Sequence, residues 1–225
     1  MIELSAIDCR ILGSLVEKAH TTGSSQYPMS LNGLTTACNQ KSNREPVTNY
    51  TEDQVQQALD GLTRRNLAIS VSSPSSRVWK YKHNLREALQ VGTSELVILA
   101  EMLLRGPQTL GELRSRGSRM HPLESLDVVH NLIEHMQQRD EPLVRQIDPA
   151  PGSRAERFGQ LLCKDLHPIE SAPKVRPVLA EASDNSIEHV EMLSRIEALE
   201  LRVESLADAL KQLTEKLGEP DPGLL

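Results

Sequence analysis

The sequence predicts a mainly α-helical protein with small β hairpins, built as two tandem winged helix-turn-helix domains and a C-terminal coiled-coil helix. Three observations lead to this prediction. An ordered set of helix and strand patterns occurs twice in the first two thirds of the chain. A heptad repeat follows near the C-terminus. Aromatic residues make up only 2% of the 225 residues, which argues against a β sandwich or barrel filled by aromatic and β-branched side chains.

The first predicted domain covers residues 1–90. Its expected elements are a helix over about 4–20, a short helix after the cap Ser30, a helix over about 51–65, and strands over 67–71 and 78–83. The third helix has the i, i+3, i+4, i+7 apolar spacing of one buried face, in Val55, Ala58, Leu59 and Leu62. A Ser-Ser-Pro-Ser-Ser stretch between the strands is typical of a turn.

The second predicted domain, residues 91–166, repeats this order at offsets of 74 to 79 residues. Its expected elements are a helix over about 94–105, a short helix after the cap Thr109, a helix over about 123–138, and strands near 143–147 and 155–158. Any two amphipathic helices share such spacing, but that alternative does not explain five elements in matching order. We therefore interpret the repeat as a duplicated winged-helix unit.

The C-terminal quarter changes character. Residues 167–186 contain three prolines without periodicity and predict an extended linker. Residues 187–218 predict a coiled-coil helix with Ile196, Val203, Leu210 and Leu217 at heptad position a and Leu199, Leu206 and Leu213 at position d. Ile or Val at a with Leu at d favours a parallel two-stranded coil, which predicts a homodimer. The alternative is an amphipathic helix that folds back on its own domain.

Charge and composition exclude several classes of protein. The net charge is -6, with +2 in residues 1–90, -3 in 91–170 and -5 in 171–225, so a general polyanion binder is not expected. No apolar run approaches the roughly 20 residues that span a bilayer, and no signal peptide pattern opens the chain. Three widely spaced cysteines suit reduced thiols in a cytoplasmic protein without membrane contact.

Three stretches carry a family resemblance: Ala37–Val47, Leu103–Arg114 and Pro151–Arg157. They closely resemble the YceH-like family of bacterial proteins, and the resemblance covers about residues 1–165. It implies two winged-helix domains in tandem, in agreement with the repeat, and no catalytic or binding residue can be carried over from it. The stretch Thr22–Pro28 departs from the more usual loop of the family.

A winged helix commonly binds DNA through its third helix and its wing. Here the leading turns of the third helices contain acidic residues, including Glu52, Asp53 and Asp127, which repel phosphate. The candidate nucleic-acid contacts are therefore Arg77, Lys80 and Lys82 on the first wing, Arg114, Arg116 and Arg119 in the turn of the second domain, and Arg154 and Arg157 on the second wing. The alternative is that these are solvated surface side chains.

The loop between the second and third helices of the first domain is a further candidate site. Its polar residues Asn39, Gln40, Lys41, Asn43 and Arg44 could contact bases, phosphate or a partner. Alternatively, the amides hold the long loop together through backbone hydrogen bonds.

The sequence holds no zinc-ligand spacing, no phosphate-binding glycine loop and no nucleophile elbow, so we expect a protein without enzymatic activity, cofactor or metal ion. Two functions remain: a dimeric regulatory protein that binds double-stranded DNA, or a scaffold whose winged-helix domains dock a protein partner. A continuous surface of Arg77, Lys80, Arg114 and Arg116 would favour DNA. Scattered basic residues beside an exposed apolar groove between the domains would favour a protein.

Overall fold

A computed structural model describes residues 2–23, 26–73, 76–149, 152 and 154–163. These residues lie within one compact unit, Met1–Ala172. The described ranges contain seven helices and two three-stranded antiparallel sheets, so the protein combines helices with small β hairpins, as expected. The linker expected over 167–186 and the coiled coil expected over 187–218 lie outside the described residues.

The first half contains three helices and a three-stranded sheet. In chain order they are α1 (Ala6–Thr21), β1 (Met29–Ser30), α2 (Leu31–Cys38), α3 (Glu52–Arg64), β2 (Ala68–Ser73) and β3 (Ser76–His83). The strand order is β1-β3-β2, with Ser30 opposite Lys80 and Ser70 opposite Tyr81. A short helix, α4 (Leu85–Leu89), leads to the second half.

The second half repeats the same order of elements. They are α5 (Thr93–Arg105), β4 (Gln108–Thr109), α6 (Leu110–Gly117), α7 (Leu126–Gln137), β5 (Val144–Ile147) and β6 (Arg157–Gln160). The strand order β4-β6-β5 matches β1-β3-β2. The internal repeat in the sequence therefore corresponds to a repeat of element order and of strand order.

Side-chain caps explain where several of these helices begin. The Ser30 hydroxyl accepts the backbone N–H of Gly33, and the Thr109 hydroxyl accepts that of Glu112, which confirms both expected caps. The expected start of α7 at about residue 123 is wrong. The Ser125 hydroxyl accepts the Val128 N–H, and α7 begins at Leu126. Leu123 instead lies buried in the preceding turn.

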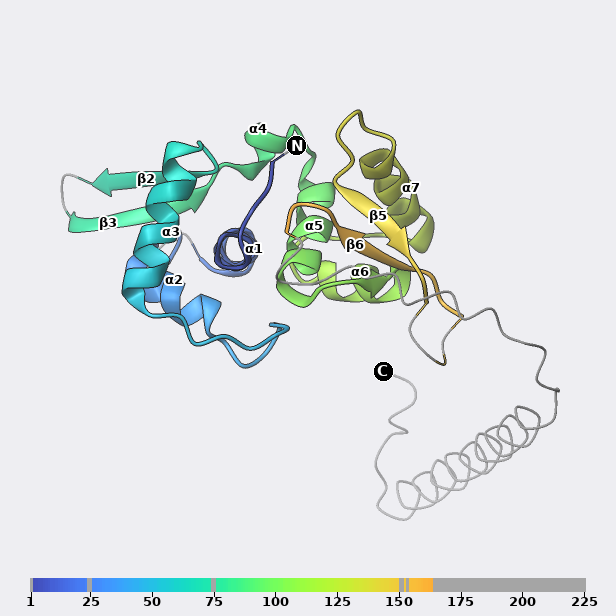
Figure 1. The fold of residues 1–225 in the computed structure, drawn as a ribbon, viewed down its shortest axis with the longest axis horizontal. Helices are drawn as coiled ribbons and strands as arrows, with labels where there is room; N and C mark the ends of the chain where they lie inside the picture. Colours follow the sequence, from blue (N-terminus) through green and yellow to red (C-terminus); the bar gives the residue numbers. More distant parts are fainter. Residues whose placement is uncertain (1, 24–25, 74–75, 150–151, 153, 164–225) are drawn as a thin grey trace, which may run out of the picture. The chain divides into compact units, whose positions relative to one another are not determined.

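The two halves share one hydrophobic core. Figure 1 shows α1 and α5 side by side in the middle, with α2, α3 and the β2–β3 hairpin on one side and α6, α7 and β5–β6 on the other. Gly13 of α1 allows this contact, because a Cβ there would lie 2.9 Å from Leu104 Cγ of α5. The backbone N–H of Leu4 also donates to the Leu162 carbonyl at 2.8 Å. The repeated halves are thus joined through a packed helix pair.

Candidate nucleic-acid interface

The first hairpin presents lysines and exposed apolar residues together. Lys80 and Lys82 lie on β3 and are partly exposed, whereas Val78 and Trp79 on the same strand are each 56% exposed. The alternation of strand side chains turns Tyr81 into the core, where it is 7% exposed. Arg77 lies on β3 as well. Of the predicted contacts on this hairpin, Lys80 and Lys82 are thus partly accessible to solvent.

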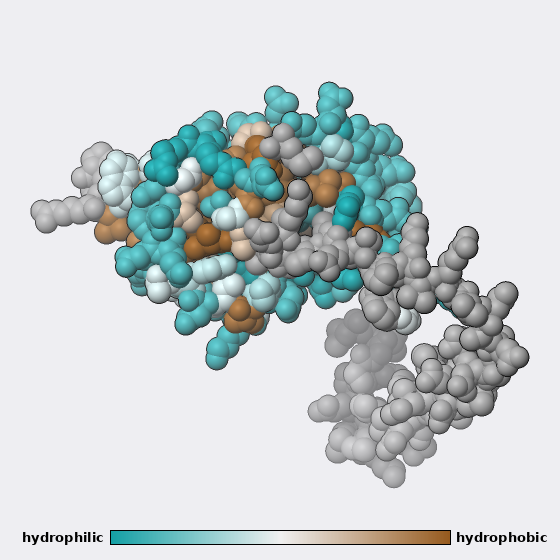
Figure 2. Space-filling view, in the orientation of Figure 1, coloured by the Kyte–Doolittle hydropathy of each residue, from teal (hydrophilic) through white to brown (hydrophobic). Residues whose placement is uncertain are grey.

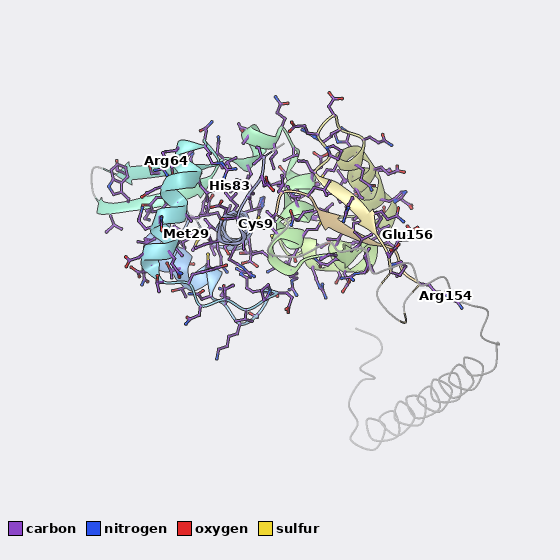
Figure 3. The ribbon with its side chains drawn as sticks, viewed as in Figure 1. Cys9, Met29, Arg64, His83, Arg154 and Glu156 are labelled. Carbon is purple, nitrogen blue, oxygen red and sulfur yellow. The ribbon has the colours of Figure 1, made fainter. Side chains whose placement is uncertain are left out.

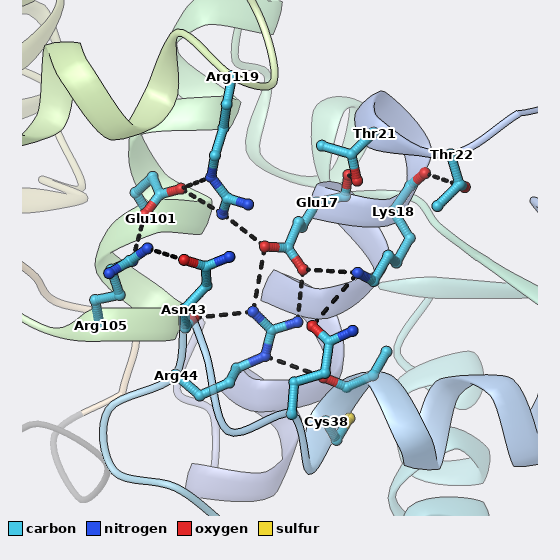
Figure 4. Close-up of polar contacts among 12 residues, drawn as sticks. Glu17, Lys18, Thr21, Thr22, Cys38, Asn43, Arg44, Glu101, Arg105 and Arg119 are labelled. Atoms are coloured by element: carbon cyan, nitrogen blue, oxygen red, sulfur yellow. Dashed lines mark hydrogen bonds and ion pairs between the residues drawn. The ribbon is translucent and has the colours of Figure 1, made fainter.

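Two of the expected contact residues lie in a charge cluster between α1, α5 and the two interhelical segments (Figure 4). Arg44, whose side chain is 0% exposed, binds both carboxylate oxygens of Glu17 on α1, at 2.6 and 3.2 Å. Arg119 binds Glu17 Oε1 at 2.6 Å and Glu101 Oε1 of α5 at 2.7 Å. We call Glu17, Glu101, Lys18, Arg44, Arg105 and Arg119 the charge cluster.

The charge cluster keeps the Glu17 carboxylate ionised. Burial by itself would raise the pKa of Glu17, but the hydrogen bonds and charges of Arg44 and then Arg119 outweigh burial and lower this pKa to about 2. Arg44 also donates from Nε to the Ala37 carbonyl at 3.0 Å. These donors are directed inward, so Arg44 is not part of an exposed surface. Arg119 bridges two carboxylates from different halves of the molecule.

Three other arginines of the second half also bond to the protein itself. Arg114 donates to the carbonyls of Leu123 and Glu124, and Arg157 donates to the Pro107 carbonyl at 2.8 Å. Arg116 donates to Gln108 Oε1 at 2.7 Å and pairs with Glu112 at 3.0 Å. Arg154 is exposed beside Glu156 near the second hairpin. These contacts explain how the arginines stabilise the turn between α6 and α7 and the base of the hairpin.

The polar loop after α2 is held mainly by its own side chains. Asn39 accepts the Tyr50 N–H and donates to the Tyr50 carbonyl, both at 2.8 Å. Asn43 has a φ of 61° and accepts a hydrogen bond from Arg105. Gln40 accepts from Lys18 at 3.4 Å, and Lys41 is exposed. Of the five candidates, Lys41 is the one charged side chain that this part of the structure leaves facing solvent.

The exposed side chains of the third helices are mostly acidic, polar or apolar, and Arg64 at the end of α3 is an exposed cation. Glu52, Asp53 and Asp60 are exposed on α3. On α7, Leu126 is 49% and Val128 is 37% exposed, on either side of Asp127. Neither helix presents a cation in its first turn. Such surfaces are not typical of a helix that contacts bases in the major groove, because base contacts need nearby cations that bind the phosphates.

The basic residues do not gather on one surface. The hairpin with Lys80 lies on one side of α1 in Figure 1, and α6 with Arg114 and Arg116 lies on the other. Figure 3 places Arg64 of α3 and Arg154 at opposite ends of the described part. Figure 2 shows the face turned to the viewer as mainly hydrophilic, with hydrophobic residues in separate patches.

Sequence reasoning missed Glu17 and Glu101, the centres of the charge cluster. A signal was present, because each carboxylate interrupts an apolar helical stretch: Leu-Val-Glu at 15–17 and Leu-Ala-Glu-Met-Leu-Leu at 99–104. Charged residues are almost never fully buried unless they are paired. Such a position predicts a buried partner but does not identify it, and Arg119 lies 102 residues from Glu17.

The comparisons with known proteins assign the family. The family model described as a protein of unknown function, DUF480, matches residues 4–153. The chain belongs to the DUF480 family. A UPF0502 protein of Geobacter sulfurreducens is 45% identical over 208 residues, which cover 91% of this chain and 90% of the relative. The UPF0502 protein YceH of Salmonella paratyphi C is 40% identical over 225 residues, covering 96% and 99% of the two chains. The expected YceH-like membership is confirmed.

Other features of this DUF480 member concern its thiols and helices. Cys9, Cys38 and Cys163 are buried, and burial raises the pKa of the Cys38 thiol to about 11. The described ranges hold no group of three or more His, Cys, Asp or Glu residues placed to bind a metal ion. Within those ranges, no helix combines the length and apolarity needed to span a bilayer.

Proposed function

We propose that the chain is a non-enzymatic tandem winged-helix protein that docks another protein, and that pairs of chains join through the heptad segment 187–218. The repeated order of helix, strand, helix, helix, strand, strand supports the winged-helix assignment. The charge cluster supports protein docking over DNA binding by the second half, because Arg119 is already paired with the carboxylates of Glu17 and Glu101.

The main support for the proposal is that large apolar side chains at the start of α7 are exposed to solvent. Leu126 and Val128 are 49% and 37% exposed, and the exposed carboxylates Glu124 and Asp127 lie beside them. Apolar residues within a charged rim are typical of a protein contact, in which the centre is desolvated and the rim stays wet. The partner that fits this surface presents an apolar residue flanked by lysines or arginines.

The C-terminal segment of the same chain is not the proposed occupant of this surface, because both are acidic. Residues 171–225 have a net charge of -5, and the first turn of α7 is acidic. Like charges placed together across an interface oppose binding. A separate, basic protein surface is therefore the proposed occupant.

A photo-crosslinking amino acid at position 128 tests the proposal in cells of the source organism. Position 138, where the exposed Gln138 lies at the far end of the same helix, is the matched control. A partner captured at 128 is then purified, and its Kd for the full chain is measured. Val128→Asp is expected to weaken binding at least tenfold and Gln138→Asp less than twofold. Equal crosslinking at both positions, or an unchanged Kd for Val128→Asp, would refute the docking function.

The first hairpin supports a second candidate function, binding of double-stranded DNA. Lys80 and Lys82 are partly exposed and lie two positions apart on β3, so they share one face of the strand, and the exposed Trp79 lies on the same hairpin. Retention of genomic duplex fragments should then fall steeply between about 50 and about 200 mM salt, because phosphate contacts release counterions. Lys80→Ala with Lys82→Ala should reduce that salt slope by roughly 2. Absence of retention at the lower salt would exclude this candidate.

A further inference from the structure

A groove in the first half of the molecule combines two lysines with an apolar floor. It lies between the end of α1, the segment before α2, α2 itself and β3, and has a volume of about 450 Å³, within the roughly 300–1,000 Å³ of small-molecule sites. Lys18 and Lys80 line it, together with Ser30, Gln40, Met29 and Ala37. We call it the Lys18–Lys80 groove. It is separate from the apolar turn of α7.

The charge cluster leaves positive charge at the edge of this groove. Its two carboxylates, Glu17 and Glu101, are contacted by four cations. Glu17 Oε2 lies 2.6 Å from Arg44 Nη2 but 3.4 Å from Lys18 Nζ. The carboxylate therefore neutralises the charge of Arg44 more than that of Lys18. Lys18 is the member of the cluster that lines the groove. Lys18 therefore brings to the lining of the groove an ammonium group whose contacts with Glu17 and Gln40 are both long, at 3.4 Å.

Lys80 adds a second positive charge from β3. Within the described ranges it has no ion-pair partner, and its strand pairing with Ser30 fixes it beside the start of α2. The hydrogen bond from Lys18 uses the Gln40 oxygen, which leaves the Gln40 amide nitrogen as a donor. Two ammonium groups and an amide donor match a phosphate group, and Met29 and Ala37 supply apolar contact for an attached organic group.

We infer that the Lys18–Lys80 groove binds a small organic phosphate monoester, with the phosphate between the two ammonium groups. The inference does not depend on the docking surface of α7. It gives this DUF480 member a small-molecule site through which an anionic ligand can stabilise the first half.

Phenyl phosphate is the probe, added to the full-length protein at ionic strength held constant with sodium chloride. Binding is followed by amide chemical shifts in ¹⁵N–¹H NMR and by titration calorimetry. The expected result is saturable shifts at the groove residues and a Kd weakened at least fivefold by Lys80→Met. Lys82→Met is the matched control, because Lys82 lies on the same strand and does not line the groove. It should change the Kd less than twofold.

Three outcomes would overturn the inference. The first is that phenyl phosphate shifts the groove amides no more than added chloride does. The second is that Lys82→Met weakens binding as much as Lys80→Met. The third is that benzoate binds as tightly as phenyl phosphate, which would assign the groove to carboxylates. Lys18→Met serves as a second variant, with its fold checked by thermal unfolding because Lys18 also contacts Glu17.

Discussion

At the scale of single residues, Glu17 has the largest predicted effect on stability. Glu17→Gln removes the charge that Arg44 and Arg119 share, and leaves the fully buried Arg44 guanidinium without its counter-ion. Removing one partner of a buried pair costs roughly 3–5 kcal/mol. Urea unfolding should show this loss. The control is Glu112→Gln, since the Glu112–Arg116 pair is 42% and 35% exposed and such pairs contribute at most about 1 kcal/mol. Similar losses in both variants would contradict a special role of the cluster.

The partly buried His83 predicts a dependence of stability on pH. Burial first, and then the charges of His20 and Lys82, lower the pKa of His83 to about 4 in the folded protein, whereas an unfolded histidine titrates near 6.5. The unfolded chain therefore binds more protons between these values. Stability is complete above about pH 7 and falls as the pH drops from about 6.5 to 4.

The measurement is the free energy of unfolding at pH 7.5, 6 and 5. His83→Phe keeps an aromatic ring near Tyr27 and should lose less stability between pH 7.5 and 5 than the original protein. His130→Phe is the control, because His130 is 47% exposed. The remaining slope in His83→Phe is assigned to His20, whose pKa is also lowered by burial and by His121. An unchanged pH dependence in His83→Phe would rule out this assignment.

At the scale of elements, the contact between α1 and α5 depends on close approach at Gly13. Gly13→Val would place carbon atoms within 3 Å of the Leu104 side chain, in a core without room for them. Overpacking of this kind costs roughly 1–3 kcal/mol. Gly111→Ala in α6 is the matched control, because nothing lies within 4 Å of a Cβ there, and it should be neutral or stabilising. Leu104→Ala should recover part of the Gly13→Val loss in thermal unfolding. Additive losses would argue against the contact.

Elements with strong local signals could be predicted from the sequence, and elements fixed by distant contacts could not. The helix faces, the caps Ser30 and Thr109, and both hairpins follow from periodicity and turn chemistry. The last strand, expected near 155–158, begins two residues later and runs over Arg157–Gln160. The two-residue strands β1 and β4 are too short for any period, and they form because β3 and β6 supply their hydrogen bonds. The same limit applies to the charge cluster, whose ion pairs could not be predicted from the sequence. The residue types around Arg44 and Arg119 suggest a basic surface, but their carboxylate partners come from α1 and α5, far away in the chain.

At the scale of the whole molecule, the halves behave as one body because they share a core. The cluster of Glu17, Glu101 and Arg119 crosses between them, and so does the backbone bond from Leu4 to Leu162. A docking surface on α7 is therefore fixed relative to the Lys18–Lys80 groove. A rigid body of this kind presents its surfaces in constant geometry, which reduces the entropy lost on binding.

Assembly is the last prediction, and it depends on the heptad segment outside the described residues. With Ile or Val at position a and Leu at d, the segment is expected to pair two chains in parallel, giving a mass of twice 25.0 kDa by light scattering. Leu206→Asp with Leu213→Asp places charges in the seam and should halve the mass. Ser205→Asp, at the outward position c, should leave it unchanged.

Deletion of residues 187–225 should also give a monomer, with a mass below the 25.0 kDa of the full chain. Its Tm should be unchanged, because the described core does not include these residues. A pair of chains would offer two α7 surfaces, so a partner with two matching sites would bind the dimer more tightly by effective concentration alone. The monomeric variants should then lose this gain while keeping the affinity of a single surface. A mass that stays doubled after the deletion would locate the dimer contact in the part of the chain before residue 187 instead.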